Sequence, residues 1–226
     1  MHQNANKFLR FLFSGLLFLA LIPAVKAQTV LLDPPEVYLG ATGGMTGSIV
    51  MFNPTVNQTM PLLGYNGGLS FRFVTESHCG LQIEANYSQR GWEEASGNYS
   101  RRADYVEFPL LTHLYWGKTN RFIFNLGPKL SYLLQETDLV NNVTAPEEQQ
   151  KTAIYHPFDY GIAAGFGYNL HTRRVGVFQL ETRAYYGLSN IFADTKRDYF
   201  RASNFLNISV SLGYYFQLTG KKDISE

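Results

Sequence analysis

Residues 158–170, FDYGIAAGFGYNL, decide how the rest of the chain is interpreted. Their glycines suit a phosphate-binding loop, the packing face of a membrane helix, or the small-residue face of a β-strand. No Lys-Ser/Thr pair follows the glycines and the Gly-x-Gly-x-x-Gly order is missing, which excludes both nucleotide-binding loops. Gly161 and Gly165 have the Gly-xxx-Gly spacing of membrane helices, but Asp159 and Asn169 interrupt a run that is too short to span a bilayer. The strand interpretation remains.

Read with a period of two, this stretch has two unlike faces. Aromatic and aliphatic residues occupy positions 158, 160, 162, 164, 166, 168 and 170, whereas the alternate positions carry Asp159, glycine, alanine and Asn169. Such alternation is typical of a strand with one apolar face. We expect the glycines to give up volume inside a barrel, and the longer Lys129 and Arg183 of neighbouring strands to fill it.

The same alternation recurs along the chain and predicts eight strands. The first, EVYLGATGGMTGS at 36–48, is weaker because glycine occurs on both faces. The other segments are LGYNGGLSFRF (63–73), GLQIEANYSQRGW (80–92), DYVEFPLLTHLYW (104–116), RFIFNLGPKLSYLLQ (121–135), VFQLETRAYYGL (177–188) and NFLNISVSLGYYF (204–216).

The connections between these strands alternate in length. TESHC, GKTN and HTRR are short, whereas the stretches around IVMFNPTVNQTMP, EEASGNYSRRA, TDLVNNVTAPEEQQKTAIYH and NIFADTKRDYFRAS are long and polar. Short turns at one end and long loops at the other indicate an up-and-down barrel. The predicted fold class is all-β, an eight-stranded antiparallel transmembrane β-barrel.

The N-terminus predicts export. Lys7 and Arg10 precede an apolar run and a small-residue site, so residues 1–27 read as a cleaved signal peptide. The expected organisation is then a periplasmic segment at 28–35, the barrel at 36–216 and a periplasmic tail at 217–226. Removing Lys7, Arg10 and Lys26 leaves 16 of the 19 Lys and Arg residues against 18 Asp and Glu, a net charge of −2, so nothing points to a nucleic-acid partner. A single cysteine, Cys79, excludes an internal disulfide.

Three features favour a membrane barrel over a soluble one. Strands of about 10 to 13 residues match a tilted membrane strand, and the aromatic residues of LYW, YYG and GYYF at strand ends match interfacial girdles. The polar face mixes small residues with charges of both signs, as a narrow lumen requires. With an export signal, the predicted location is the outer membrane of a Gram-negative cell. The predicted lumen charges are Arg72, Glu84, Arg90, Glu107, Lys129, Asp159, Glu181 and Arg183.

These segments resemble the PorT-like outer-membrane β-barrel proteins of Bacteroidota. The resemblance rests on GLQIEANYSQRGW, YVEFPLL, LGPKLSYLL, FDYGIAAGFGYNL, RAYYGLSNI and SVSLGYYF, spread over nearly the whole mature chain. It implies an integral outer-membrane barrel, in a family with one founding member associated with type IX secretion and gliding, a role that nothing in these residues selects. The usual barrel-assembly signal is a last strand that ends in an aromatic residue at the C-terminus, but here QLTGKKDISE follows Phe216. We therefore expect the signal for the barrel-assembly machinery to be internal.

The expected function is a structural or interaction role, with outer-membrane lipid around the barrel, a lumen filled by paired charges, and long extracellular loops that contact an envelope protein partner. A small pore or a transport- or secretion-associated subunit is one alternative, and a soluble periplasmic ligand-binding barrel is another. No catalytic, cofactor or metal site is expected. His113 is the one histidine assigned to the lumen, and it has no serine two residues away with which to form a deacylase pair.

Overall fold

The computed structural model describes residues 31–53, 59–141, 153–172, 175–192 and 201–220. Within these ranges, no helix is long and apolar enough to cross a membrane. The described residues form eight strands: β1 (Leu31–Asn53), β2 (Thr59–Glu76), β3 (Cys79–Glu94), β4 (Tyr99–Gly117), β5 (Asn120–Asn141), β6 (Phe158–Thr172), β7 (Gly176–Gly187) and β8 (Ala202–Thr219).

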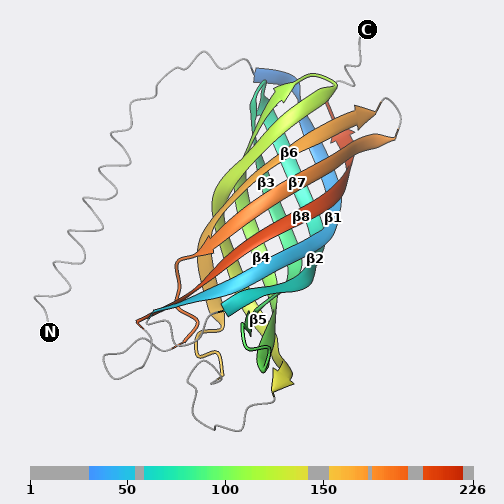
Figure 1. The fold of residues 1–226 in the computed structure, drawn as a ribbon. Helices are drawn as coiled ribbons and strands as arrows, with labels where there is room; N and C mark the ends of the chain where they lie inside the picture. The colour runs from blue at the N-terminus through green and yellow to red at the C-terminus, as the bar shows by residue number, and fades with distance from the viewer. Residues whose placement is uncertain (1–30, 54–58, 142–152, 173–174, 193–200, 221–226) are drawn as a thin grey trace, which may run out of the picture. The chain divides into compact units, whose positions relative to one another are not determined.

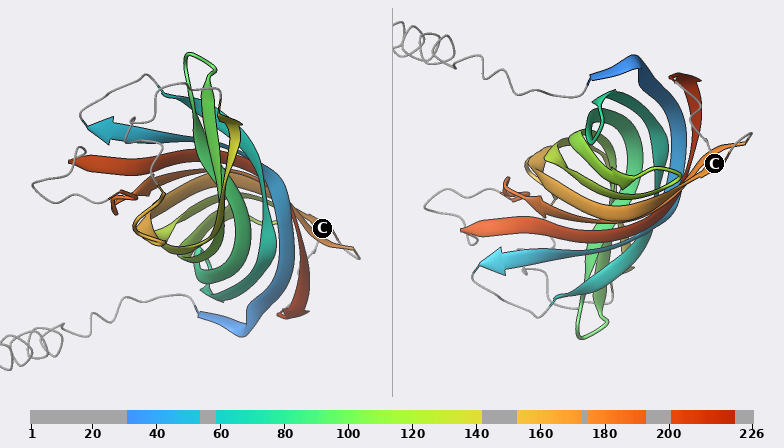
Figure 2. Two further views of the ribbon diagram at one scale, coloured as in Figure 1. Left: turned by 90° about the horizontal axis from the view of Figure 1, so that it is seen from below. Right: turned by 90° about the horizontal axis from the view of Figure 1, so that it is seen from above.

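The strands form one closed antiparallel barrel, in which each pairs with the next in sequence and β8 pairs with β1 (Figures 1 and 2). The predicted fold class is thereby confirmed. Strand pairing followed around the barrel from Val37 returns to β1 at Gly47, a stagger of ten residues (47 − 37). Eight strands with such a stagger leave an interior that side chains fill. The circuit passes through Phe73, Leu81, Thr112, Leu126, Ala164, Ala184 and Ile208.

The two ends of the barrel differ. At the turn end, strands are joined by residues 77–78, 118–119 and 173–175. At the loop end, the connection between β3 and β4 spans only residues 95–98, not the eleven residues of EEASGNYSRRA. The expected loop is therefore wrong there, because pairing of β4 with β3 and β5 continues almost to Tyr99. Most of the segment at 142–157, including APEEQQK, lies outside the described residues.

The strands also run past the predicted barrel limits of 36 and 216. Leu31 pairs with Glu76, and Thr219 pairs with Val37, so backbone pairing includes parts of the segments predicted at 28–35 and 217–226. Neither segment alternates clearly in hydropathy, which is why its pairing was missed. The predicted signal peptide at 1–27 lies outside the described residues.

The apolar face of the barrel points outward. Leu63 and Leu212 are 71% and 69% exposed, and large apolar side chains on all eight strands are similarly exposed. A continuous exposed apolar belt is the arrangement of a membrane barrel and the reverse of a soluble ligand-binding barrel.

Only some of the aromatic residues assigned to the girdles lie on this outer belt. In LYW, YYG and GYYF, the residues Trp116, Tyr186, Tyr214 and Phe216 are exposed. Their neighbours Tyr115, Tyr185 and Tyr215 are buried. Neighbouring residues of a strand point to opposite faces, so each motif supplies both the belt and the lumen.

Candidate functional site

The lumen is the candidate site, and its side chains form layers. The layer nearest the turn end is mainly aromatic and aliphatic and comprises Tyr38, Val74, Tyr115, Ile123, Val177 and Tyr215. Arg121 reaches Glu36 at 2.9 Å in this region, and Glu36 accepts a hydrogen bond from the Tyr38 hydroxyl. This layer covers the turn end of the polar interior.

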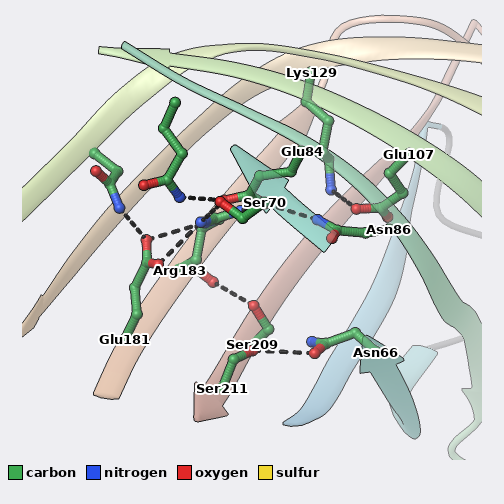
Figure 3. Close-up of polar contacts among 12 residues, drawn as sticks. Asn66, Ser70, Glu84, Asn86, Glu107, Lys129, Glu181, Arg183, Ser209 and Ser211 are labelled. Atoms are coloured by element: carbon green, nitrogen blue, oxygen red, sulfur yellow. Dashed lines mark hydrogen bonds and ion pairs between the residues drawn. The ribbon is translucent and has the colours of Figure 1, made fainter. Parts of the chain in front are cut away.

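Above it, six polar side chains from β2, β3 and β7 close a ring of hydrogen bonds across the lumen, which we call the turn-side network. Arg183 donates to Glu84 at 2.6 Å and to Glu181 at 2.9 Å, and Figure 3 shows it between these two carboxylates. Arg72 closes the ring by donating to both glutamines. The members are Arg72, Gln82, Glu84, Arg183, Glu181 and Gln179.

Arg72 occupies a different environment from the one expected. Among the described residues it forms no ion pair; its guanidinium donates to Gln82 at 2.7 Å and to Gln179 at 2.6 Å. It also lies 4.2 Å from the ring centroid of Tyr215. The two amides each contact a carboxylate in turn, so Arg72 reaches Glu84 and Glu181 through a glutamine rather than directly.

Replacing Gln179 with alanine tests this ring. The change removes the acceptor of one Arg72 N–H group in a buried site, and a buried donor left unsatisfied costs about 1–3 kcal/mol. We expect a loss of this size in the free energy of unfolding, measured by urea titration of the detergent-folded protein. Gln135→Ala is the matched control because Gln135 is exposed. Equal losses for the two variants would contradict a stabilising ring.

Towards the loop end lies a second set of charges, the loop-side network, which centres on Arg90 of β3. Arg90 contacts Glu107 and Asp159, the latter at 2.6 Å, and donates to the Ser131 hydroxyl at 2.8 Å. Lys129 donates to the second oxygen of Glu107 at 2.9 Å. The network joins β3, β4, β5 and β6, so it connects a second section of the barrel wall.

Aromatic rings surround this second network. The Arg90 guanidinium lies 4.7 Å from the Tyr105 ring centroid and 4.8 Å from that of Tyr185, and the Lys129 ammonium lies 3.7 Å from Tyr185. Rings at these distances stabilise a desolvated cation. Beyond them, an apolar layer fills the loop end and includes Val50, Phe52, Trp92, Tyr99, Ile154, Ile191, Phe192 and Phe205.

The structure thus places all eight predicted charges inside the barrel and divides them between two networks. Arg72, Glu84, Glu181 and Arg183 belong to the turn-side network, and Arg90, Glu107, Lys129 and Asp159 belong to the loop-side network. Sequence reasoning placed the two glutamines on the polar faces of their strands but gave them no role in the charge network, and it did not assign the inward aromatic residues to the lumen. Their positions were available, because Gln82, Gln179, Tyr105 and Tyr185 each lie two residues from a predicted lumen charge and so share its face.

The space left by the β6 glycines is filled differently from the expectation. A Cβ atom built on Gly165 would lie 2.1 Å from Glu181 Oε1, and one on Gly161 would lie 2.1 Å from the Tyr186 carbonyl oxygen. Lys129 and Arg183 are therefore not the groups that fill this space. Arg183 is paired in register with Gly165, but its guanidinium extends across the lumen to Glu84.

A small cavity of about 40 Å³ lies in the lumen. Its lining includes Glu84 and Arg183 of one network, Glu107 and Lys129 of the other, and hydroxyl and amide groups of β1, β2 and β8. A cavity that holds one water needs about 10–15 Å³ on this measure. The volume suits a few ordered waters rather than an organic ligand.

Among the histidines that the structure describes, two rather than one lie on the inward face. His113 Nδ1 is 2.7 Å from Asn125 Oδ1, and the His113 ring stacks on Tyr115. His171, expected in a turn, belongs to β6 and packs edge-on against Tyr38. Within the described ranges, no three His, Cys, Asp or Glu side chains are grouped so as to hold a metal ion.

Comparisons with known proteins match this chain to one family model and to several solved structures. A family model described as an outer membrane protein β-barrel domain matches residues 27–193. No curated protein matches the chain. Similar solved structures include OprG from Pseudomonas aeruginosa, with 11% identity and a TM-score of 0.48, covering 80% of this chain and 96% of that one. Ail of Yersinia pestis has 13% identity and a TM-score of 0.43, covering 80% of this chain and 99% of that one. Neisserial surface protein A has 8% identity and a TM-score of 0.45, covering 80% of this chain and 97% of that one.

Proposed function

The chain belongs to the outer membrane protein β-barrel domain family, and from this premise we propose that it is a closed, non-conducting barrel with a structural or interaction role at its loop end. The observation that carries the proposal is the layering of the lumen. An aromatic layer, two charge networks and an apolar layer follow one another along the axis.

The charge balance of the two networks supports closure. The turn-side network has two arginines and two glutamates, and the loop-side network has Arg90 and Lys129 against Glu107 and Asp159. Each set is neutral when fully ionised, so neither needs a mobile counter-ion. Such buried pairs are held firmly, because separating them would expose unpaired charges to a medium of low dielectric constant.

Conductance tests the closed lumen directly. Purified full-length protein inserted into planar lipid bilayers is expected to show no steps of steady unit size, whereas a porin inserted under the same conditions provides the positive control. Insertion is verified separately by protease protection of the reconstituted protein. Regular unit steps from the wild-type protein would contradict closure and favour the second candidate, a small pore or transport-associated subunit, for which the polar cavity lined by both networks is the supporting feature.

Several finer assignments belong to the same proposal. We assign the chain to the PorT-like proteins of Bacteroidota, with export by the signal at 1–27, a non-enzymatic role and assembly through the strand that contains Phe216. The turn end then faces the periplasm, and the loop end faces outside, where it meets an envelope protein partner. Extraction of cell membranes with carbonate tests the membrane assignment, because release without detergent would favour the soluble periplasmic alternative.

A further inference from the structure

The charges of the two networks are confined to one sector of the barrel wall, β2 to β7. Arg72 belongs to β2, and the other seven charges belong to β3–β7. β8 carries no charged residue, and those of β1, Asp33 and Glu36, lie near the turn end. The cavity is lined by both this charged sector and the closing strands β1 and β8. The closing strands contribute hydroxyl and amide groups, those of Thr42, Thr46, Asn207, Ser209 and Ser211.

One uncharged side chain connects the closing strands to β2. Asn66 Nδ2 donates to the Thr46 hydroxyl at 2.7 Å, and Asn66 Oδ1 accepts a hydrogen bond from the Ser211 hydroxyl at 3.0 Å. Figure 3 shows the contact between Asn66 and Ser211 together with Lys129 and Asn86 of the charged sector. All four residues line the cavity drawn between these groups.

Several polar groups on the cavity wall lack a partner in the protein. Ser88 is 3% exposed, and its hydroxyl makes no hydrogen bond to any described residue, which is also true of the Thr42 hydroxyl. Asn86 Oδ1 is buried without a partner. Lys129 is 5% exposed and donates one hydrogen bond while lying over the Tyr185 ring, although an ammonium has three N–H groups. Buried polar groups usually bind either protein or ordered water.

The chemistry of the wall suits water better than an ion. Each carboxylate oxygen on the described wall already accepts a hydrogen bond from an arginine or a lysine, which leaves none free for a metal ion. Three carboxylates against two cations oppose an inorganic anion. Water is neutral and can donate to Asn86 while it accepts from Lys129 and Ser88. The carboxylates are Glu84, Glu107 and Glu181, and the cations are Lys129 and Arg183.

We propose that the cavity is a binding site for a small cluster of water molecules, held by Asn86 and Ser88 of β3, Lys129 of β5 and Thr42 of β1. An internal water typically makes about three hydrogen bonds to buried groups that otherwise lack partners. The cluster hydrates the Lys129 ammonium and joins the closing strands to both charge networks. The inference rests on the proposed closed lumen, because bulk solvent would hydrate the same groups in an open pore.

A crystal structure of the full-length protein in detergent, at a resolution that shows ordered water, tests the site. We expect solvent density within hydrogen-bond distance of Lys129 Nζ and of Asn86 Oδ1. Crystals soaked in rubidium chloride and in sodium bromide separate water from ions, because rubidium and bromide scatter anomalously and water does not. A cavity without density, density of an organic molecule, or an anomalous peak inside the cavity would overturn the proposal.

Two substitutions measure whether the water is bound. Ser88→Ala and Thr42→Val each remove a hydroxyl that has no partner among the described residues, so a dry cavity predicts unchanged or higher stability. We expect instead that the folding equilibrium constant, from urea titration, falls about threefold to tenfold, the usual contribution of one hydrogen bond. Thr182→Val is the matched control, because Thr182 is exposed on the outer face of β7, and it should cause no fall. An unchanged or higher constant for Ser88→Ala would contradict the proposal.

The water site and the closed lumen can fail separately. Regular conductance steps from a protein whose crystals hold the ordered water would contradict the closed lumen alone. A non-conducting protein whose cavity shows no solvent density would contradict the water site alone.

Discussion

Arg90→Met is expected to lower the free energy of unfolding by about 3–5 kcal/mol, the usual effect of removing one partner from a buried ion pair. The Arg90 side chain has no solvent exposure and is in contact with two carboxylates, Glu107 and Asp159. Lys129 would still neutralise Glu107, but among the described residues Asp159 would keep only the hydroxyls of Tyr185 and Ser189. A buried carboxylate left without a cation opposes folding.

Urea unfolding of the detergent-folded protein, followed by heat-modifiable gel migration, measures this effect. Arg102→Met is the matched control, since Arg102 lies on the same hairpin, contacts Asp104 at 3.2 Å and keeps 32% of its side chain exposed. Its partner Asp104 is 12% exposed, but water still reaches the Arg102 side chain, so we expect a smaller loss than for Arg90→Met.

A compensated variant separates loss of charge pairing from loss of packing. In Arg90→Met combined with Asp159→Asn, Glu107 keeps Lys129 as its partner and no unpaired charge remains in this network, so we expect much of the lost stability to return. If Arg90→Met proves no more destabilising than Arg102→Met, the loop-side network does not stabilise the barrel in the way described.

The strands and their inward faces followed from the sequence because alternation is a local property. The residues of FDYGIAAGFGYNL keep the predicted alternation throughout β6, with Asp159, Ala163 and Asn169 buried and Phe166 exposed. The same reasoning placed Arg72 and Arg183 inside. A period of two can be recognised without knowing which strands are neighbours, so the prediction does not depend on the arrangement of the strands.

Partners across the lumen did not follow, because they depend on the stagger of the whole barrel. Arg183 contacts Glu84, which is 99 positions away in the sequence, and Arg72 contacts Gln179, which is 107 positions away. No local pattern encodes either contact. The shortened loop between β3 and β4 was missed for a different reason: the polar residues of SRRAD resemble a loop, although they pair on both sides in the strand.

Gly165 provides the second large effect, and Gly165→Phe is expected to prevent assembly of the barrel. Even a single Cβ atom there would lie 2.1 Å from Glu181 Oε1. The end of a glutamate side chain usually moves easily, but this carboxylate accepts hydrogen bonds from Asn125, Gln179 and Arg183. A phenyl ring must displace it and break the turn-side network, and overpacking of this kind adds a cost of typically about 1–3 kcal/mol or more.

Gly43→Phe is the matched control, because a Cβ atom on Gly43 would meet only the Asn66 carbonyl oxygen, at 3.8 Å, and the exposed Gly43 lies among outward-facing residues of β1. Folding yield after dilution from urea into detergent, read from heat-modifiable migration, should fall steeply for Gly165→Phe and stay near the wild-type value for Gly43→Phe. Gly165→Ala should fall between them, since Glu181 needs to shift only slightly for a methyl group. Normal folding of Gly165→Phe would contradict this prediction. It would show that Glu181 does not need the space beside Gly165 and that the lumen accommodates a phenyl ring there.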